Sequence, residues 1–135
     1  MGGNVAVLGE FLRSFLEDGP DAALVYVAPD VVADEPASMP YGGTYRGKDE
    51  FAELMRKMAA TVEIRVAGFD LHESGDTVVA RFDSTFVDRA TGVDVVMPMV
   101  GLYSFTAGLI SRTDMFYKDT KVWADRGGVV PEAAR

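Results

Sequence analysis

The sequence predicts a single α+β domain, with helices in its first half and an antiparallel sheet in its second. Apolar residues recur at helical spacing in the first half, and from Val62 onward the spacing becomes that of extended strands. Glycine-containing turns then divide the rest of the chain into four β-rich segments. Helices segregated to one side of an antiparallel sheet define this fold class. A chain of 135 residues can bury one core and is too short for two.

Two helices are predicted at the start of the chain. The first is amphipathic and ends at the break formed by residues 18–20. Its apolar residues are spaced three and four apart: Leu8, Phe11, Leu12, Phe15 and Leu16. Pro20 suits the first position of a short second helix. That helix should stop near Ala28, because the residue before Pro29 is disfavoured in the α region.

A short strand is predicted over residues 31–35, followed by a loop rich in Pro, Gly and Tyr over 36–47. A third helix begins at Lys48 and places Phe51, Leu54, Met55 and Met58 on one face. The four strands that follow Val62 are separated by turns at 73–76, 89–92 and 106–108, which predicts an antiparallel meander. We expect one domain over residues 1–123 and a loosely ordered tail over 124–135.

Composition excludes several functional classes. A net charge of −8 repels phosphate backbones and anionic lipids, so we expect no nucleic-acid partner and no membrane partner. The chain has no cysteine and a single histidine, His72, so cysteine chemistry and a multi-histidine metal site are excluded. Any catalysis must then rest on carboxylates, Tyr, Arg and Lys, and we expect no cofactor and no metal.

The sequence also predicts a cytoplasmic location. No apolar run reaches the roughly 20 residues that a membrane span needs. The first 16 residues lack the basic segment and the cleavage site of a signal peptide.

Three stretches of the chain, 28–36, 42–51 and 101–110, together with the order of the elements, resemble the SnoaL-like branch of the nuclear transport factor 2-like superfamily. This superfamily includes ketosteroid isomerases, limonene-type epoxide hydrolases and polyketide cyclases. The resemblance covers roughly residues 5 to 120. It implies a cone-shaped, cystatin-like roll in which a curved sheet wraps an apolar pocket closed by the N-terminal helices. It also implies a small apolar organic ligand and a homodimer formed through the outer face of the sheet.

Glu35, directly before Pro36, is similar to the general-base aspartate that ketosteroid isomerases place before a proline at the end of the first strand. Burial in an apolar pocket would raise the pKa of such a carboxyl toward the working pH. Asp34 is the alternative candidate, because alternation in a strand sends only one of two neighbours into the pocket. The oxyanion-hole donors of the isomerases have no counterpart here. Their tyrosine falls on Phe11 or Leu12 and their aspartate near Gly101, so steroid isomerisation is disfavoured.

Arg81 and Asp83 are similar to the Arg-x-Asp of limonene-type epoxide hydrolases, and Asp114 resembles the third member of that set. Residues two apart share a strand face, so Arg81 and Asp83 could instead form an ion pair on the outer face. The position of Asp114 is one residue nearer Gly108 than the family pattern requires, which could place Met115 in the pocket.

We expect a methionine-rich pocket, since methionine fills irregular space and tolerates varied ligands. Its predicted wall consists of Phe51, Met55, Met97, Met99, Tyr103, Met115 and Tyr117. Tyr41, Tyr45 and Tyr117 are candidate hydroxyl donors. We predict a cavity of about 300 Å³ or more. Met97, Met99 and Tyr103 lie on one strand and would face inward. The residues that alternate with them, Val96, Pro98, Val100 and Leu102, would then lie on the outer sheet face.

The leading hypothesis is therefore an enzyme that uses cofactor-free general acid–base catalysis on a small apolar carbonyl or epoxide compound. The isomerase, polyketide cyclase and epoxide hydrolase types all remain open. The alternative is a non-catalytic ligand-binding or dimerisation module on the same fold.

Overall fold

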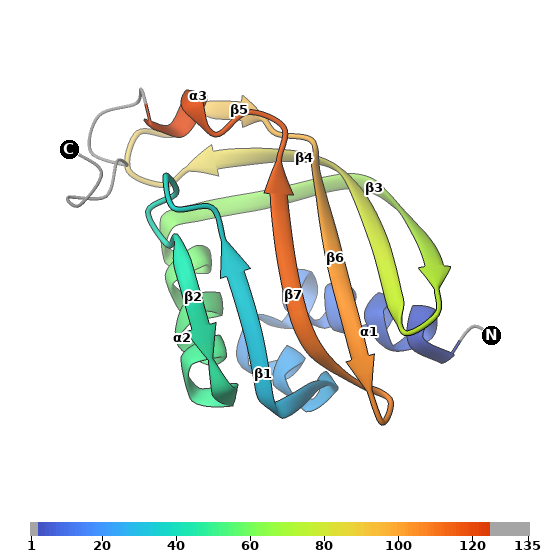
Figure 1. Ribbon diagram of the computed structural model, residues 1–135. Coiled ribbons are helices and arrows are strands. Elements are labelled where there is room, and N and C mark those ends of the chain that lie inside the picture. Colours follow the sequence, from blue (N-terminus) through green and yellow to red (C-terminus); the bar gives the residue numbers. More distant parts are fainter. Residues whose placement is uncertain (1–2, 125–135) are drawn as a thin grey trace.

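The computed structural model describes residues 3–124 and forms a strongly curved sheet with helices packed on its concave side (Figure 1). Two long helices, α1 (Gly3–Asp18) and α2 (Gly47–Thr61), cover that side. A 3₁₀ helix, η1 (Asp21–Tyr26), leads from α1 into the sheet, and the short α3 (Lys121–Ala124) follows the last strand. The α+β class and the cone-shaped architecture predicted from the sequence are confirmed.

The sheet has seven strands: β1 (Val27–Glu35), β2 (Gly43–Arg46), β3 (Val62–Ser74), β4 (Thr77–Asp88), β5 (Asp94–Val96), β6 (Met99–Thr106) and β7 (Leu109–Tyr117). Their order is β2-β1-β7-β6-β4-β3, with β5 paired to β4. Strands β3 to β7 form the predicted antiparallel meander. The first strand joins it through a parallel pairing of β1 with β7, in which Ala33 lies opposite Thr113 and Asp34 opposite Asp114.

The alternation of apolar residues decides which face of each strand is buried. Along β4, every second residue from Val78 to Asp88 is buried, and the residues between them are exposed or half-buried. The same alternation in β6 buries Met99 and Tyr103 and leaves Val100 and Leu102 half-buried on the outer face. The prediction that Met99 and Tyr103 face inward is therefore correct.

Strand β1 is longer than predicted, since it begins at Val27 and contains Pro29. Its register against β7 shifts between Val27 and Val32, so Pro29 lies where the ladder is irregular and its missing N–H costs least. After the shift the strand alternates regularly. Val31, Ala33 and Glu35 are buried, and the side chains between them face outward.

The loop between β1 and β2 is compact and contributes to the core. Met39 and Tyr41 are both buried, and backbone hydrogen bonds join Met39 to Pro36 and Gly42 to Met39. A Cβ on Gly42 would lie 2.3 Å from the carbonyl oxygen of Pro36. Only glycine permits this close backbone approach, which fixes the position of Tyr41.

Two local predictions are wrong, and one short helix was not predicted. The segment 43–46, expected within a loop, forms β2 because it pairs with the end of β1. The third predicted strand is divided into β5 and β6 by residues 97–98, where Pro98 cannot donate to a ladder. The segment 121–124 forms α3, whose buried Trp123 packs on the ring of Phe86 with centroids 6.1 Å apart. The rest of the predicted tail lies outside the described residues.

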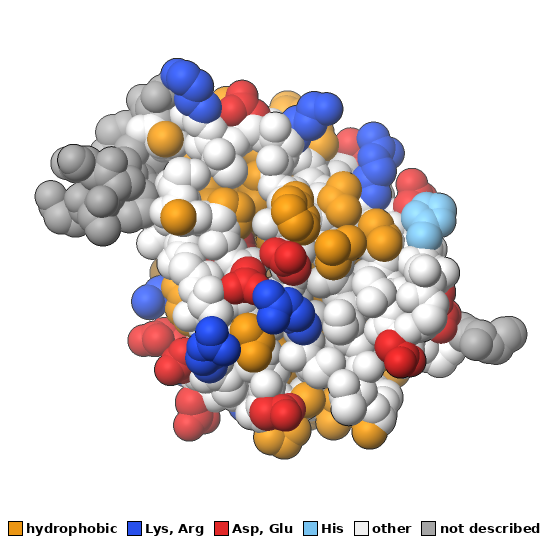
Figure 2. Space-filling view, viewed as in Figure 1, with side chains coloured by type: hydrophobic (Ala, Val, Ile, Leu, Met, Phe, Trp, Pro, Cys, Tyr) orange, Lys and Arg blue, Asp and Glu red, His pale blue; other side chains and the backbone are white. Residues whose placement is uncertain are grey.

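The convex face of the sheet carries an apolar strip. Hydrophobic side chains gather there over β4, β6 and β7 (Figure 2). Val96 and Phe116 are 75% and 53% exposed, and Val100 and Leu102 are half-buried between them and the core. Within residues 3–124, no helix has the length and apolar character needed to cross a membrane.

Candidate active site

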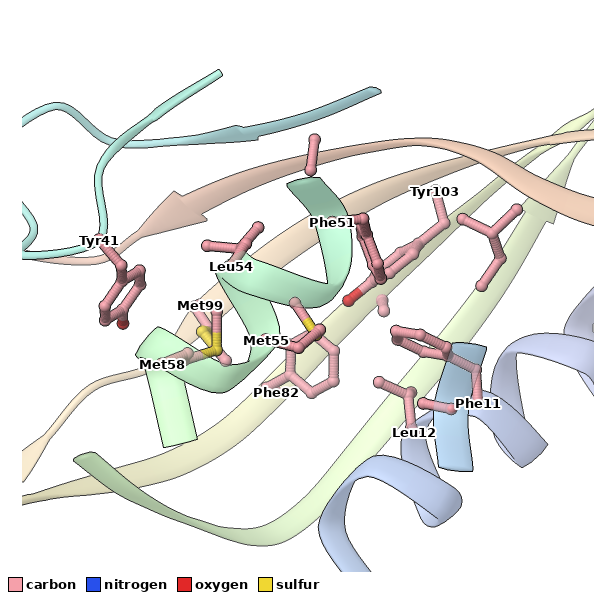
Figure 3. Close-up of a cluster of buried hydrophobic side chains, with 14 of the residues drawn as sticks. Phe11, Leu12, Tyr41, Phe51, Leu54, Met55, Met58, Phe82, Met99 and Tyr103 are labelled. Atoms are coloured by element: carbon pink, nitrogen blue, oxygen red, sulfur yellow. The ribbon is translucent and has the colours of Figure 1, made fainter. Parts of the chain in front are cut away.

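An apolar cavity lies between the concave face of the sheet and the helices α1 and α2. Figure 3 shows buried side chains of this region, among them Phe11, Phe51 and Tyr103. The two helices contribute Phe11, Leu12, Phe15, Leu16, Phe51, Met55 and Met58 to its wall, and the sheet contributes Glu35, Ile64, Val66, Phe82, Met99, Tyr103, Thr113, Met115 and Tyr117. Its volume is about 60 Å³, well below the predicted 300 Å³. The prediction of size is wrong because methionine and phenylalanine side chains fill most of the cone. A larger ligand must displace them, which flexible methionines allow.

Glu35 is the only carboxylate among the lining residues. It is the last residue of β1, and its side chain is 7% exposed. Asp34 points to the outer face, where the Thr44 hydroxyl donates to it at 2.7 Å and the Arg112 guanidinium forms an ion pair with it. The structure thus distinguishes the two neighbours that the sequence left as alternatives.

A chain of hydroxyl groups ends on Glu35. The Tyr117 hydroxyl donates to Glu35 Oε1 at 2.9 Å, and the hydroxyls of Tyr117 and Tyr41 are 2.8 Å apart. The Tyr45 hydroxyl donates to the backbone carbonyl of Tyr41 at 3.0 Å, which fixes the loop that carries Tyr41. Sequence reasoning named all three tyrosines as possible donors, but not this connection. Glu35 Oε2 forms no hydrogen bond within residues 3–124.

Burial raises the pKa of Glu35 to about 8. The hydrogen bond from Tyr117 opposes this shift, and the nearby charges of Asp114 and Asp34 add to it. Near neutral pH both the protonated and the ionised form of the Glu35 carboxyl are therefore populated. A group of this kind can accept or donate a proton at the working pH of an ordinary cell.

Glu35 also borders an open cleft on the other side of the sheet edge. This outer cleft, of about 350 Å³, is lined by Asp34, Glu35, Pro36, Asp114, Met115, Phe116, Tyr117 and Thr120. Asp114 belongs to the cleft, and Met115 takes the inward position on β7 with Thr113 and Tyr117. The expectation that Asp114 reaches the apolar pocket is therefore wrong. The one-residue offset seen in the sequence is the reason.

Arg81 and Asp83 lie on the exposed outer face of β4, away from the cavity. The buried face of this strand carries Ala80, Phe82 and Ser84. No ion pair joins Arg81 to Asp83 within residues 3–124. Their expected place beside a ligand is wrong, because the apolar alternation of β4 determines which face is buried.

Six residues of the predicted wall do line the cavity: Phe51, Met55, Met99, Tyr103, Met115 and Tyr117. Their contact with a ligand stays a prediction. Met97 is fully buried but does not line it. The chain bends at Pro98, and the Met97 N–H donates to Ser84 on β4. Sequence reasoning missed eight lining residues, although the apolar face of the first helix was a usable signal: Phe11, Leu12, Phe15, Leu16, Ile64, Val66, Phe82 and Thr113.

The described residues contain no group of three or more His, Asp or Glu side chains that could hold a metal ion. The wall is apolar apart from Glu35, Thr113 and the tyrosines 103 and 117. This arrangement suits an apolar molecule with one polar end placed near Glu35.

A curved sheet with helices packed over an apolar cavity on its concave side is the cone-shaped α+β fold of the nuclear transport factor 2-like proteins. Residues 8–113 match the family described as the SnoaL-like domain, and the chain belongs to that family. No curated protein matches the chain.

Solved structures share this fold over most of their length. An NTF2-like protein from Burkholderia pseudomallei K96243 is 25% identical, with a TM-score of 0.80 over 90% of this chain and 95% of its own. A candidate polyketide cyclase from Xanthomonas campestris pv. campestris is 20% identical, with a TM-score of 0.79 over 90% and 94% of the two chains. TerC, co-crystallised with polyporic acid, is 20% identical, with a TM-score of 0.78 over 89% and 94%.

Proposed function

We propose that the protein is an enzyme in which Glu35 transfers a proton to or from a small, largely apolar carbonyl compound. The observation that carries this proposal is a buried carboxyl with a pKa of about 8 at the end of an apolar cavity. Such a carboxyl is poised to remove a proton from a carbon beside a carbonyl group. No cofactor is needed for this step.

The surroundings of Glu35 suit repeated proton transfer. Tyr117 holds Oε1 in place, so Oε2 is the oxygen that acts on the substrate. Because Glu35 also borders the outer cleft, water there can return the carboxyl to its starting protonation state while the cavity stays occupied. Apolar walls exclude water from the reacting carbon, which keeps the carboxyl basic.

Ring opening of an epoxide by an Arg-Asp cluster receives no support from this arrangement. Arg81 and Asp83 are exposed on the outer face, and Asp114 borders the cleft. We therefore favour the isomerase and polyketide cyclase types of reaction. The co-crystal of the similar protein TerC with polyporic acid is in keeping with a cavity that takes small organic molecules.

We also propose that the protein is a homodimer, in which the apolar strip of one copy covers that of a second. The strip consists of Val96, Pro98, Val100, Leu102 and Phe116 on the outer sheet face. A continuous strip of this kind favours burial in an interface.

Proton transfer can be tested without knowing the natural substrate. Cyclic ketones such as 2-tetralone and cyclohexanone exchange the hydrogens beside the carbonyl for deuterium in D₂O, which proton NMR measures directly. We expect the protein to accelerate this exchange for at least one ketone at pH 8.5, and Glu35→Gln to abolish the acceleration. The amide keeps the shape of the side chain but cannot accept a proton.

Asp83→Asn is the matched control, since it also neutralises a carboxylate but on the exposed face. It should exchange the ketone as fast as the unmodified protein. If neither the unmodified protein nor Asp83→Asn exchanges the ketone faster than Glu35→Gln does, the acid–base proposal is wrong. Saturable ketone binding in that case would favour the non-catalytic ligand-binding module.

A further inference from the structure

Tyr103 differs from the other buried tyrosines in having a free hydroxyl. The hydroxyls of Tyr41, Tyr45 and Tyr117 are all hydrogen-bonded to protein atoms. Tyr103 is 4% exposed and lines the cavity, and its hydroxyl forms no hydrogen bond within residues 3–124. In Figure 3 this oxygen points toward Phe51 and Met55, on the wall that α2 contributes.

The ring of Tyr103 is held in this position from two sides. The Phe11 ring packs edge-on against it, with centroids 6.4 Å apart. On its other side lies Gly101, where an added Cβ would come within 2.6 Å of the Tyr103 ring and 2.7 Å of the Met115 sulfur. The absence of a side chain at Gly101 therefore makes the space that the Tyr103 ring and Met115 occupy.

The Tyr103 hydroxyl lies at the cavity with no protein acceptor, so its proton remains available to a polar group that enters the cavity. A ligand oxygen in the cavity would supply the missing acceptor. The carbonyl compound proposed above carries such an oxygen beside the carbon from which Glu35 takes a proton.

We propose that Tyr103 is a catalytic residue that donates a hydrogen bond to the substrate carbonyl oxygen. The inference rests on the proposed function. Glu35 removes a proton from the carbon beside the carbonyl, the electrons of that C–H bond form a carbon–carbon double bond, and the carbonyl electrons move to oxygen. Tyr103 stabilises the negative charge that develops on that oxygen. Glu35 then loses the proton to solvent D₂O at the outer cleft and takes up a deuteron, and transfer of that deuteron to the carbon restores the carbonyl and completes the exchange.

The state of the hydroxyl suits this role. Burial, and then the nearby charge of Glu35, raise the pKa of Tyr103 above its ordinary value. The hydroxyl therefore keeps its proton over the whole pH range in which Glu35 becomes ionised.

The test uses cyclohexanone labelled with ¹³C at the carbonyl and two readouts. The infrared carbonyl stretch of the bound ketone reports the hydrogen bond, and deuterium exchange beside the carbonyl reports catalysis. We expect Tyr103→Phe to raise the stretching frequency and to slow exchange by about 100-fold, while binding changes only a few-fold. Tyr26→Phe is the matched control, because it also removes a tyrosine hydroxyl, but from a residue that does not line the cavity.

Gly101→Ala provides a second variant that should raise the frequency as well, since its methyl group displaces the Tyr103 ring. If Tyr103→Phe leaves the frequency unchanged while Glu35→Gln still abolishes exchange, the role of Tyr103 is wrong and the proposed function stands. If the frequency rises in Tyr103→Phe but the unmodified protein never exchanges the ketone, Tyr103 binds the carbonyl and the acid–base function is wrong.

Discussion

Glu35 acquires its properties from its position at the end of β1. Alternation turns it inward, and the apolar cavity then disfavours its charged form. The same two-residue period sends Asp34 outward, where Arg112 and Thr44 bind its carboxylate. Two adjacent acidic residues thus have different chemistry because they lie on opposite faces of one strand.

The raised pKa of Glu35 predicts a pH-dependent stability. Between the ordinary pKa near 4.5 and the folded-state value of about 8, the folded protein holds a proton that the unfolded chain has lost. Stability should therefore fall as pH rises through this window and level off above it. The loss should be on the order of a few kcal/mol.

Urea unfolding at pH 5 and pH 9 measures this effect. Glu35→Gln should be less sensitive to the change of pH than the unmodified protein, because its amide does not ionise. Asp83→Asn, on the exposed face, should retain the full sensitivity. An equal pH dependence in Glu35→Gln and the unmodified protein would contradict the assignment of a raised pKa to Glu35.

The sequence could narrow the site to a few residues but could not complete it. Strand alternation shows that Asp34 and Glu35 diverge, yet the direction depends on which face the helices cover. For Asp114 and Met115, the decisive fact was a one-residue offset along β7. The contact between Tyr41 and Tyr117 joins residues 76 apart in the chain, and no local pattern encodes it.

At the scale of elements, prediction succeeded where a long segment kept one period. Helices α1 and α2 and strand β4 have a clear apolar face, so their limits were close to those observed. It failed for β2 and α3, which have four residues each. Such short elements are stabilised by contacts with distant residues, as β2 is by its pairing with the end of β1.

The loop between β1 and β2 allows a specific test of backbone packing. Gly42→Ala places a methyl group against the backbone of Pro36 and Ala37, which cannot move aside as a side chain would. We expect a loss of about 1–3 kcal/mol in the free energy of unfolding, measured by urea denaturation.

Gly9→Ala is the matched control. Gly9 lies inside α1, and nothing is within 4 Å of an added Cβ. This variant should gain up to about 1 kcal/mol, since alanine favours the helix more than glycine does. An unchanged free energy of unfolding in Gly42→Ala would show that the loop is not held as tightly as its contacts indicate.

For the molecule as a whole, the apolar strip on the convex face determines the expected assembly. Phe116→Arg places a charge in the middle of the proposed interface, at a side chain 53% exposed in the single chain. We expect the unmodified protein to show a dimer mass in light scattering at micromolar concentration, and Phe116→Arg to show a monomer mass.

Val25→Arg is the control for this experiment, since Val25 is 69% exposed but lies on η1, away from the strip. It should remain dimeric. A monomer mass for the unmodified protein would contradict the proposed homodimer, whereas monomers from both variants would show that added charge acts generally.

The parallel pairing of β1 with β7 has a consequence for the order of folding. Glu35 and Tyr117 are 82 residues apart, so their hydrogen bond closes nearly two thirds of the chain into one loop. Contacts of such long range form slowly, because the entropy of loop closure is lost before they contribute any stability. On the ribosome, β1 must wait without its β7 neighbour until residues 109–117 have been synthesised. The carboxyl of Glu35 therefore remains hydrated during synthesis and loses its water only when the last strand docks.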